Sequence, residues 1–143
     1  MNQRTADTMW HELLGKILKK KTGSINVEAE LSDGLLIIRC MLNGEECARI
    51  LCVVESDTAI LISDIWHRNK KKDYNKGYGT LMMEFLIQYA KNHNYECIYG
   101  NLSEIDLDHK ERLHHFYRKF GFSVIEYSET QKTFYGKAIL CTR

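Results

Sequence analysis

The order of the apolar segments constrains the fold most, because β-type runs come first and strand and helix patterns alternate afterwards. Between Leu35 and Trp66, three short runs rich in Ile, Leu and Val are separated by polar turns. One of these turns is Asn43-Gly44, a pair typical of type I′ hairpins. We therefore expect three consecutive antiparallel strands, and the alternation in residues 25–31 predicts an earlier one.

The second half of the chain shows helical spacing. Apolar residues recur every three or four positions from Gly79 to His93, and this period predicts a helix. A short strand is expected over residues 95–101. A second helix, capped by Asp106 or Asp108, is expected to end at Gly121.

Two closing strands, residues 122–127 and 133–140, complete the predicted elements, and an opening helix is expected to end near Lys21. Strands in series, followed by strand, helix, strand and helix, are typical of a mixed sheet covered by helices. The predicted fold class is therefore α/β, of the α+β type with a mixed sheet. Because no linker or repeat interrupts the 143 residues, we expect one domain, 1–143.

Composition excludes several classes of protein. Twenty basic and nineteen acidic residues leave a formal charge of +1, which argues against a nucleic-acid partner. If the chain did bind DNA or RNA, the lysine runs 19–21 and 70–72 would make the contacts. No apolar run is long enough for a membrane span and no targeting segment is visible, so we expect a cytoplasmic protein. The five cysteines lack the spacing of a zinc site, and we predict no metal.

The loop before the predicted helix carries the first chemical signal. Glycines at a helix N-terminus let an anion approach unpaired backbone N–H groups, and flanking cations add charge. The alternative is a turn with no ligand, because Gly-x-Gly alone is a weak motif. The sequence lacks the Gly-Lys-Ser/Thr of a P-loop, and Met82 replaces the third glycine of a dinucleotide fingerprint. The candidate phosphate contacts are Arg68, Lys72, Asn75, Lys76, Gly77, Tyr78, Gly79 and Thr80.

A second motif, Phe116-Tyr117-Arg118-Lys119-Phe120-Gly121-Phe122, closes the last predicted helix. Together with the Gly77-Tyr78-Gly79 turn, it resembles the GNAT superfamily of N-acetyltransferases. The resemblance extends from about Leu35 to Phe122. It implies a central, mostly antiparallel, twisted sheet flanked by helices on both faces. Tyr74 departs from the Gln or Arg that the family prefers at the start of its phosphate turn.

The resemblance implies a function and a set of roles. Acetyl-CoA would be the cosubstrate, with its pyrophosphate on the turn and its pantetheine along Ile65, Trp66 and His67. A backbone N–H of Ile65 or Trp66 would face the thioester carbonyl, and Tyr117 would be the general acid. The acetyl group would pass directly to a primary amine in a ternary complex. Without the resemblance, a core aromatic residue is the better explanation of Tyr117, because aromatic faces of helices usually pack.

The proton acceptor is less constrained. Asp64 is our first choice, on the expectation that burial raises its pKa, and Glu55 and His67 are the alternatives. Asp64 can equally brace a neighbouring loop. A metal at His114 and His115 is not expected, because adjacent helical side chains diverge. A regulator that binds acyl-CoA without turnover is the competing hypothesis, motivated by Tyr74, and a homodimer through the sheet is possible.

Overall fold

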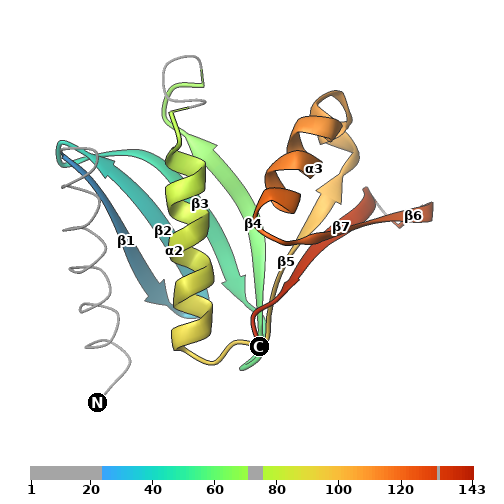
Figure 1. Ribbon diagram of the computed structural model, residues 1–143, viewed down its shortest axis with the longest axis horizontal. Coiled ribbons are helices and arrows are strands. Elements are labelled where there is room, and N and C mark those ends of the chain that lie inside the picture. The colour runs from blue at the N-terminus through green and yellow to red at the C-terminus, as the bar shows by residue number, and fades with distance from the viewer. Residues whose placement is uncertain (1–23, 71–75, 132) are drawn as a thin grey trace.

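Residues 24–70, 76–131 and 133–143 are described by the computed structural model of the chain. Within these ranges, seven strands form one sheet in the order β1-β2-β3-β4-β5-β7-β6 (Figure 1). All neighbours are antiparallel except β4 and β5. The strands are β1 (Ile25–Ser32), β2 (Leu35–Leu42), β3 (Glu45–Val54), β4 (Ala59–His67), β5 (Cys97–Ser103), β6 (Ser123–Gln131) and β7 (Phe134–Cys141).

Tight turns connect the first three strands. Asn43 and Gly44 have φ values of 53° and 82°, and Asp33 and Gly34 have 51° and 78°. Positive φ at both central residues is the requirement of a type I′ turn. The predicted hairpin at Asn43-Gly44 is therefore confirmed, and Asp33-Gly34 makes a second one.

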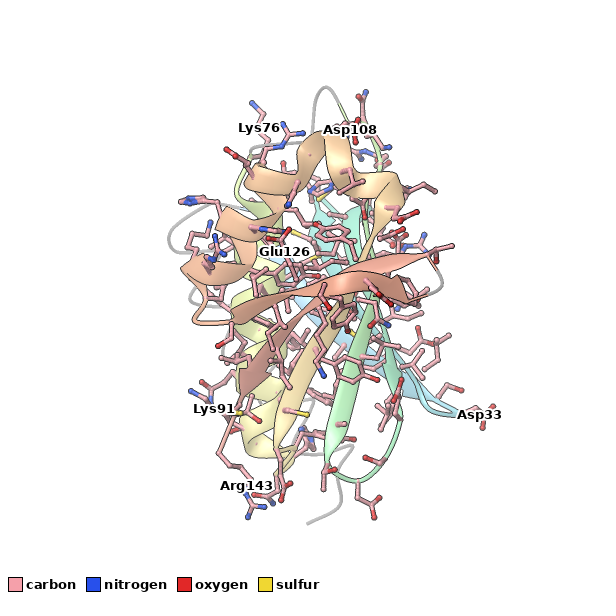
Figure 2. All side chains as sticks on the ribbon, turned by 90° about the vertical axis from the view of Figure 1, so that its right-hand side faces the viewer. Asp33, Lys76, Lys91, Asp108, Glu126 and Arg143 are labelled. Atoms are coloured by element: carbon pink, nitrogen blue, oxygen red, sulfur yellow. The ribbon has the colours of Figure 1, made fainter. Side chains whose placement is uncertain are left out.

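Helix α2 (Tyr78–Asn92) covers one face of the sheet and closes the core. Its apolar stripe supplies Met82, Met83 and Leu86, each fully buried, against fully buried residues of β2, β3, β4 and β5 such as Ile38, Ile50, Ile60 and Ile98. Figure 2 shows α2 and the second α-helix, α3 (Lys110–Lys119), on the same side of the sheet. The helix predicted from residue 79 to 93 is confirmed, whereas the predicted opening helix lies outside the described residues.

The connection between β5 and α3 (Lys110–Lys119) is a 3-10 helix, η1 (Glu104–His109). The Ser103 hydroxyl accepts a 3.3 Å hydrogen bond from the backbone N–H of Ile105 and so caps η1. Asp106 and Asp108 were predicted as caps, and this prediction is wrong because both lie inside η1. The N-cap position of α3 is His109, whose side chain makes no capping bond.

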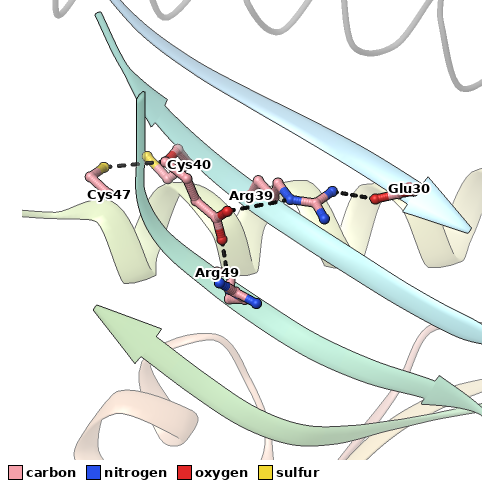
Figure 3. A network of polar contacts seen from close by, with 6 residues as sticks. Glu30, Arg39, Cys40, Cys47 and Arg49 are labelled. Atoms are coloured by element: carbon pink, nitrogen blue, oxygen red, sulfur yellow. Dashed lines mark hydrogen bonds and ion pairs between the residues drawn. The ribbon is translucent and has the colours of Figure 1, made fainter. Parts of the chain in front are cut away.

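Charged residues line the face of β1, β2 and β3 that α2 does not cover. Arg39 pairs with Glu30 at 2.6 Å and with Glu46 at 3.5 Å, and Arg49 pairs with Glu46 at 2.6 Å (Figure 3). The Arg49 guanidinium also lies 4.7 Å from the ring centroid of Trp66 on β4. This alternation of charge between neighbouring strands supports the pairing of the meander.

The described elements agree with the predicted class, a mixed and mostly antiparallel sheet flanked by helices. Helices were expected on both faces, and the two described α-helices lie on the same one (Figure 2). In the part of the chain that the structure covers, no helix has both the length and the hydropathy to span a membrane.

Candidate active site

Strands β4 and β5 pair over only four residues each and then separate. The parallel ladder runs from Ala59↔Cys97 to Ile62↔Gly100. Directly after Ile62, the register of β4 with β3 shifts, so that Ser63 is the extra residue of a bulge. Figure 1 shows the carboxyl ends of β4 and β5 diverging, with the N-terminus of α2 at the same end of the sheet. Beyond Ile62 and Gly100, the described parts of these two strands are not paired with each other.

The register of β4 determines which of its N–H groups point into the divergence. The Arg68 N–H donates to the Cys47 carbonyl at 2.9 Å, which makes these two residues a hydrogen-bonded pair. Such pairs alternate in an antiparallel ladder, so the N–H of Trp66 also points to β3 and that of Ile65 points away from it. Of the two residues predicted to face a thioester carbonyl, Ile65 has the suitable direction and Trp66 does not.

The N-terminus of α2 has the features of an anion site. Gly77 precedes the helix in the left-handed region, with φ of 84°, and as the N-cap residue it offers no side chain to cap the helix. The first turn contains no acidic residue. Tyr78 anchors the helix start in the core, while Lys76 and Gly77 are exposed. A Cβ on Gly79 would lie 3.3 Å from the ring of Phe116, so the glycine permits α3 to approach this turn closely. A negatively charged group is favoured here by the exposed N–H groups and the helix dipole.

Lys119 brings a further cation from α3 to the same helix start. Its Nζ donates to the Thr80 hydroxyl at 2.8 Å. The ammonium group lies 5.6 Å from the ring centroid of Phe116 and 5.0 Å from that of Phe120, which supports its stem. We did not predict Lys119 as a site residue, although it belongs to the aromatic motif that ends α3.

Tyr117 lies beneath the point where β4 and β5 part. Its side chain is 5% exposed, and its hydroxyl oxygen would be 2.8 Å from a Cβ on Gly100, the last β5 residue paired with β4. Burial raises the pKa of Tyr117 above the ordinary value of 10.0, and the nearby Cys52 and Asp106 add to this effect. The phenol is therefore protonated at neutral pH and can donate.

The remaining predicted residues are more dispersed. Asp64 is exposed, so the burial that we expected for it is wrong, because the strand passes the bulge before reaching it. It pairs with Leu51 and shares a sheet face with Trp66, opposite to Ile65. Glu55 lies at the other end of β4, where its N–H donates to the Ala59 carbonyl. Burial and the hydrogen bond with Glu55 raise the pKa of Tyr99 to about 12.

The loop residues divide into two groups. His67 is half-buried at the end of β4, and the Arg68 guanidinium lies 3.4 Å from Glu45, next to the β2–β3 turn. Lys72, Tyr74 and Asn75, with the contacts predicted for them, lie outside the described residues.

The histidines of α3 have different surroundings. His114 is 5% exposed, and its Nε2 lies 2.9 Å from the hydroxyl of Tyr135 on β7. Burial lowers the pKa of His114 below its ordinary value, so the ring is neutral at pH 7. His115 is exposed. The two side chains therefore point in different directions, as predicted for neighbours on a helix.

Comparisons with known proteins give one family model and one curated relative. The acetyltransferase (GNAT) family model matches residues 70–122, the segment from the loop before α2 to Phe122. YocC of Bacillus subtilis, described as an uncharacterized protein, is 28% identical over 131 residues that cover 81% of this chain and 76% of YocC.

Two solved structures illustrate the likeness in fold. A GNAT family acetyltransferase from Elizabethkingia anophelis with acetyl-CoA bound has a TM-score of 0.60 and 14% identity, over 82% of this chain and 97% of that one. The ribosomal-protein-S18-alanine N-acetyltransferase of Escherichia coli has a TM-score of 0.56 and 14% identity, over 78% and 70%. The family model over residues 70–122 and the shared fold thus confirm the resemblance to GNAT acetyltransferases that was seen in the sequence.

Proposed function

We propose that this chain transfers an acetyl group from acetyl-CoA directly to a primary amine within a ternary complex. One observation carries the proposal: the hydroxyl of Tyr117 lies at Gly100, where the β4–β5 ladder ends. The N-terminus of α2 opens at the same end of the sheet (Figure 1). An anion site and a proton donor therefore border one divergence between two strands.

The residues at the start of α2 fit the diphosphate of CoA. Gly77 and Gly79 allow the close approach of a bulky anion, and the N-terminus of a helix favours a negatively charged group. Lys119, held at Thr80, supplies a charge-assisted hydrogen bond to a phosphate oxygen. Trp66, His67 and the outward N–H of Ile65 would line the path of the pantetheine.

Acetyl-CoA, when bound, supplies an activated thioester. The Ile65 N–H would donate to its carbonyl oxygen, where negative charge develops during attack. The Tyr117 Oη–H would donate to the departing sulfur. Because burial raises the pKa of Tyr117, the phenol keeps its proton at neutral pH and is available to the departing sulfur. The tyrosinate left by a transfer to sulfur would take up the proton that the attacking amine releases.

Asp64 remains our candidate for accepting the amine proton. It occupies the sheet face opposite to Ile65, so an amine that approaches from this face would meet the thioester between Asp64 and Tyr117. Since an alkylamine has a pKa of about 10.4, it must lose a proton before attack. The exposure of Asp64 allows transfer directly or through water.

A cytoplasmic location and a homodimer also remain part of the proposal.

The experiment is a free-thiol assay with acetyl-CoA over a panel of polyamines, amino sugars, antibiotics, peptide N-termini and protein lysines, with mass spectrometry of each acceptor. We expect at least one amine to gain an acetyl group at a rate that exceeds hydrolysis of the thioester. A parallel thermal-shift titration with acetyl-CoA measures binding alone. If acetyl-CoA binds but no amine on the panel is acetylated, the chain is a binding protein and the proposed transfer is wrong.

A further inference from the structure

Two cysteines face each other across β5 and β7, away from the divergence of β4 and β5. Cys97 opens β5 and Cys141 closes β7, and the two are direct partners in the antiparallel register. The next pair along the ladder is Glu96 and Thr142, in which the Thr142 N–H donates to the Glu96 carbonyl at 2.9 Å. Because hydrogen-bonded and non-hydrogen-bonded pairs alternate, Cys97 and Cys141 form a non-hydrogen-bonded pair.

This type of pair has the backbone separation that a disulfide needs. Partners in a non-hydrogen-bonded antiparallel pair have Cα atoms about 4.5 Å apart, with side chains on the same face. Disulfides join residues whose Cα atoms are about 4.4–6.8 Å apart. The two thiols therefore need no strand movement to bond.

Contacts on both sides hold this register. The Arg143 guanidinium lies 2.9 Å from the Glu96 carboxylate, and the Thr142 hydroxyl donates to the Tyr95 carbonyl. On the other side, Leu140 pairs with Ile98, which is fully buried in the core. A slip of one residue would separate the thiols, and these contacts oppose it.

Access to solvent distinguishes this pair from the other cysteines. Cys141 is exposed and Cys97 is half-buried, whereas Cys40, Cys47 and Cys52 are fully buried. The Cys47 thiol is also occupied, because it donates to the Cys40 carbonyl at 3.3 Å (Figure 3). Burial raises the pKa of Cys52 to about 12, so it has almost no thiolate at neutral pH.

We propose that Cys97 and Cys141 form a reversible intramolecular disulfide when the chain meets a disulfide oxidant such as oxidised glutathione. The thiolate of the exposed Cys141 attacks one sulfur of the oxidant, forming a mixed disulfide and releasing one glutathione thiolate. The thiolate of Cys97 then attacks the Cys141 sulfur, closing the bond and releasing the second glutathione. Two cysteine thiols are oxidised, one disulfide is reduced to two thiols, and the two protons pass to the glutathione thiolates.

The test equilibrates the full chain with oxidised glutathione and counts thiols under denaturing conditions. We expect the count to fall from five to three, since two of the five are consumed. Peptide mapping should find Cys97 joined to Cys141 without a glutathione adduct. The bond closes a long loop that includes α3 and β6, so we expect the Tm to rise by several degrees and to return on reduction.

Single variants sharpen the result. Cys97→Ser should stop the reaction at the mixed disulfide on Cys141, because the resolving thiol is missing. Cys52→Ser, the matched control, should leave the cross-link intact. Separate glutathione adducts on Cys97 and Cys141 in the wild-type chain, or a Cys141 bridge between two chains, would overturn the proposal. Neither readout depends on acetyl transfer, so this inference and the proposed function fail independently.

Discussion

The hydroxyl oxygen of Tyr117 lies so close to Gly100 that a Cβ at position 100 would be 2.8 Å from it. Real Cβ atoms do not tolerate this separation, and the nearest carbon of the same ring, Cζ, would be 3.4 Å away. Gly100 therefore gives the phenol oxygen its position at the end of the β4–β5 ladder. The position of the Tyr117 hydroxyl therefore depends on the absence of a side chain at residue 100.

Gly100→Ala should displace the Tyr117 hydroxyl and reduce kcat. A shift of about 1 Å in a catalytic group can cost about 100-fold in rate. The measurement is a double-mutant cycle with Tyr117→Phe, followed by kcat. In the Tyr117→Phe background the clashing oxygen is absent, so the added methyl group should have little further effect on kcat. Equal losses from Gly100→Ala in both backgrounds would show that the contact has no catalytic meaning.

Tyr117→Phe by itself should lower kcat by about 100-fold to 10000-fold, the range for loss of a general acid. Affinity for acetyl-CoA should be unchanged, because the ring still packs against Phe122, 5.2 Å away between centroids. Isothermal titration gives the affinity and steady-state kinetics gives kcat. Full activity of this variant would remove Tyr117 from the mechanism.

Gly79→Glu should weaken acetyl-CoA binding by at least about tenfold, a change of about 1.4 kcal/mol. The side chain adds bulk against Phe116 and a negative charge at the start of α2. Gly79→Ala is the matched control, because it adds bulk without charge and should have a smaller effect. If both variants bind equally weakly, packing against α3 and not charge controls the site.

Lys119→Gln should weaken acetyl-CoA binding by about 10-fold to 100-fold, since hydrogen bonds to charged groups contribute about 1.5–3 kcal/mol. The loss should shrink at high salt, where screening already weakens the wild-type contact. Lys119→Arg keeps the positive charge and should retain most of the affinity. Stability should change little, because Lys119 is exposed. If the Lys119→Gln variant bound acetyl-CoA as tightly as the wild-type chain at low salt, a contact between Lys119 and a phosphate would be excluded.

The buried pair of His114 and Tyr135 should make stability depend on pH. Burial lowers the pKa of His114 in the folded state from the ordinary 6.5, so the unfolded chain binds its proton first as the pH falls. The free energy of unfolding is therefore expected to decrease as the pH drops below about 6.5. Urea titrations at pH 7.5 and in steps below 6.5 would measure this slope, with His114→Gln as the control that should flatten it.

The hydrogen bond between His114 and Tyr135 should also contribute to stability at neutral pH. Tyr135→Phe removes the hydroxyl that lies 2.9 Å from Nε2 and should destabilise the chain at neutral pH by about 1–3 kcal/mol. Unchanged stability of this variant would mean that water replaces the hydroxyl.

Local patterns predicted the elements that depend on neighbouring residues. The Asn43-Gly44 turn and helix α2 appear where expected, because positive φ at two residues and a regular apolar stripe are encoded within a few positions. Ser103 was missed as a cap because the acidic residues after it were equally good candidates in sequence.

Features that depend on distant residues were not predictable from periodicity. The bulge at Ser63 arises from pairing with β3 and places Asp64 at the surface. Lys119 of α3 reaches Thr80 at the start of α2, where the glycine at position 79 leaves room for the ring of Phe116. The family motif located Tyr117, but the relation to Gly100 needed the positions of both β5 and α3.

The short ladder between β4 and β5 leaves an edge inside the sheet. Beyond Ile62 and Gly100, the described parts of these strands are not paired with each other. Unpaired strands at the outer edge of a sheet recruit strands from other chains, and an unpaired edge within the sheet offers the same backbone groups. Under the proposed function, a pantetheine chain, which has amide groups, would lie along this edge in place of a strand. In its absence, the same backbone would accept an extended peptide, so loading with coenzyme should protect the chain against self-association.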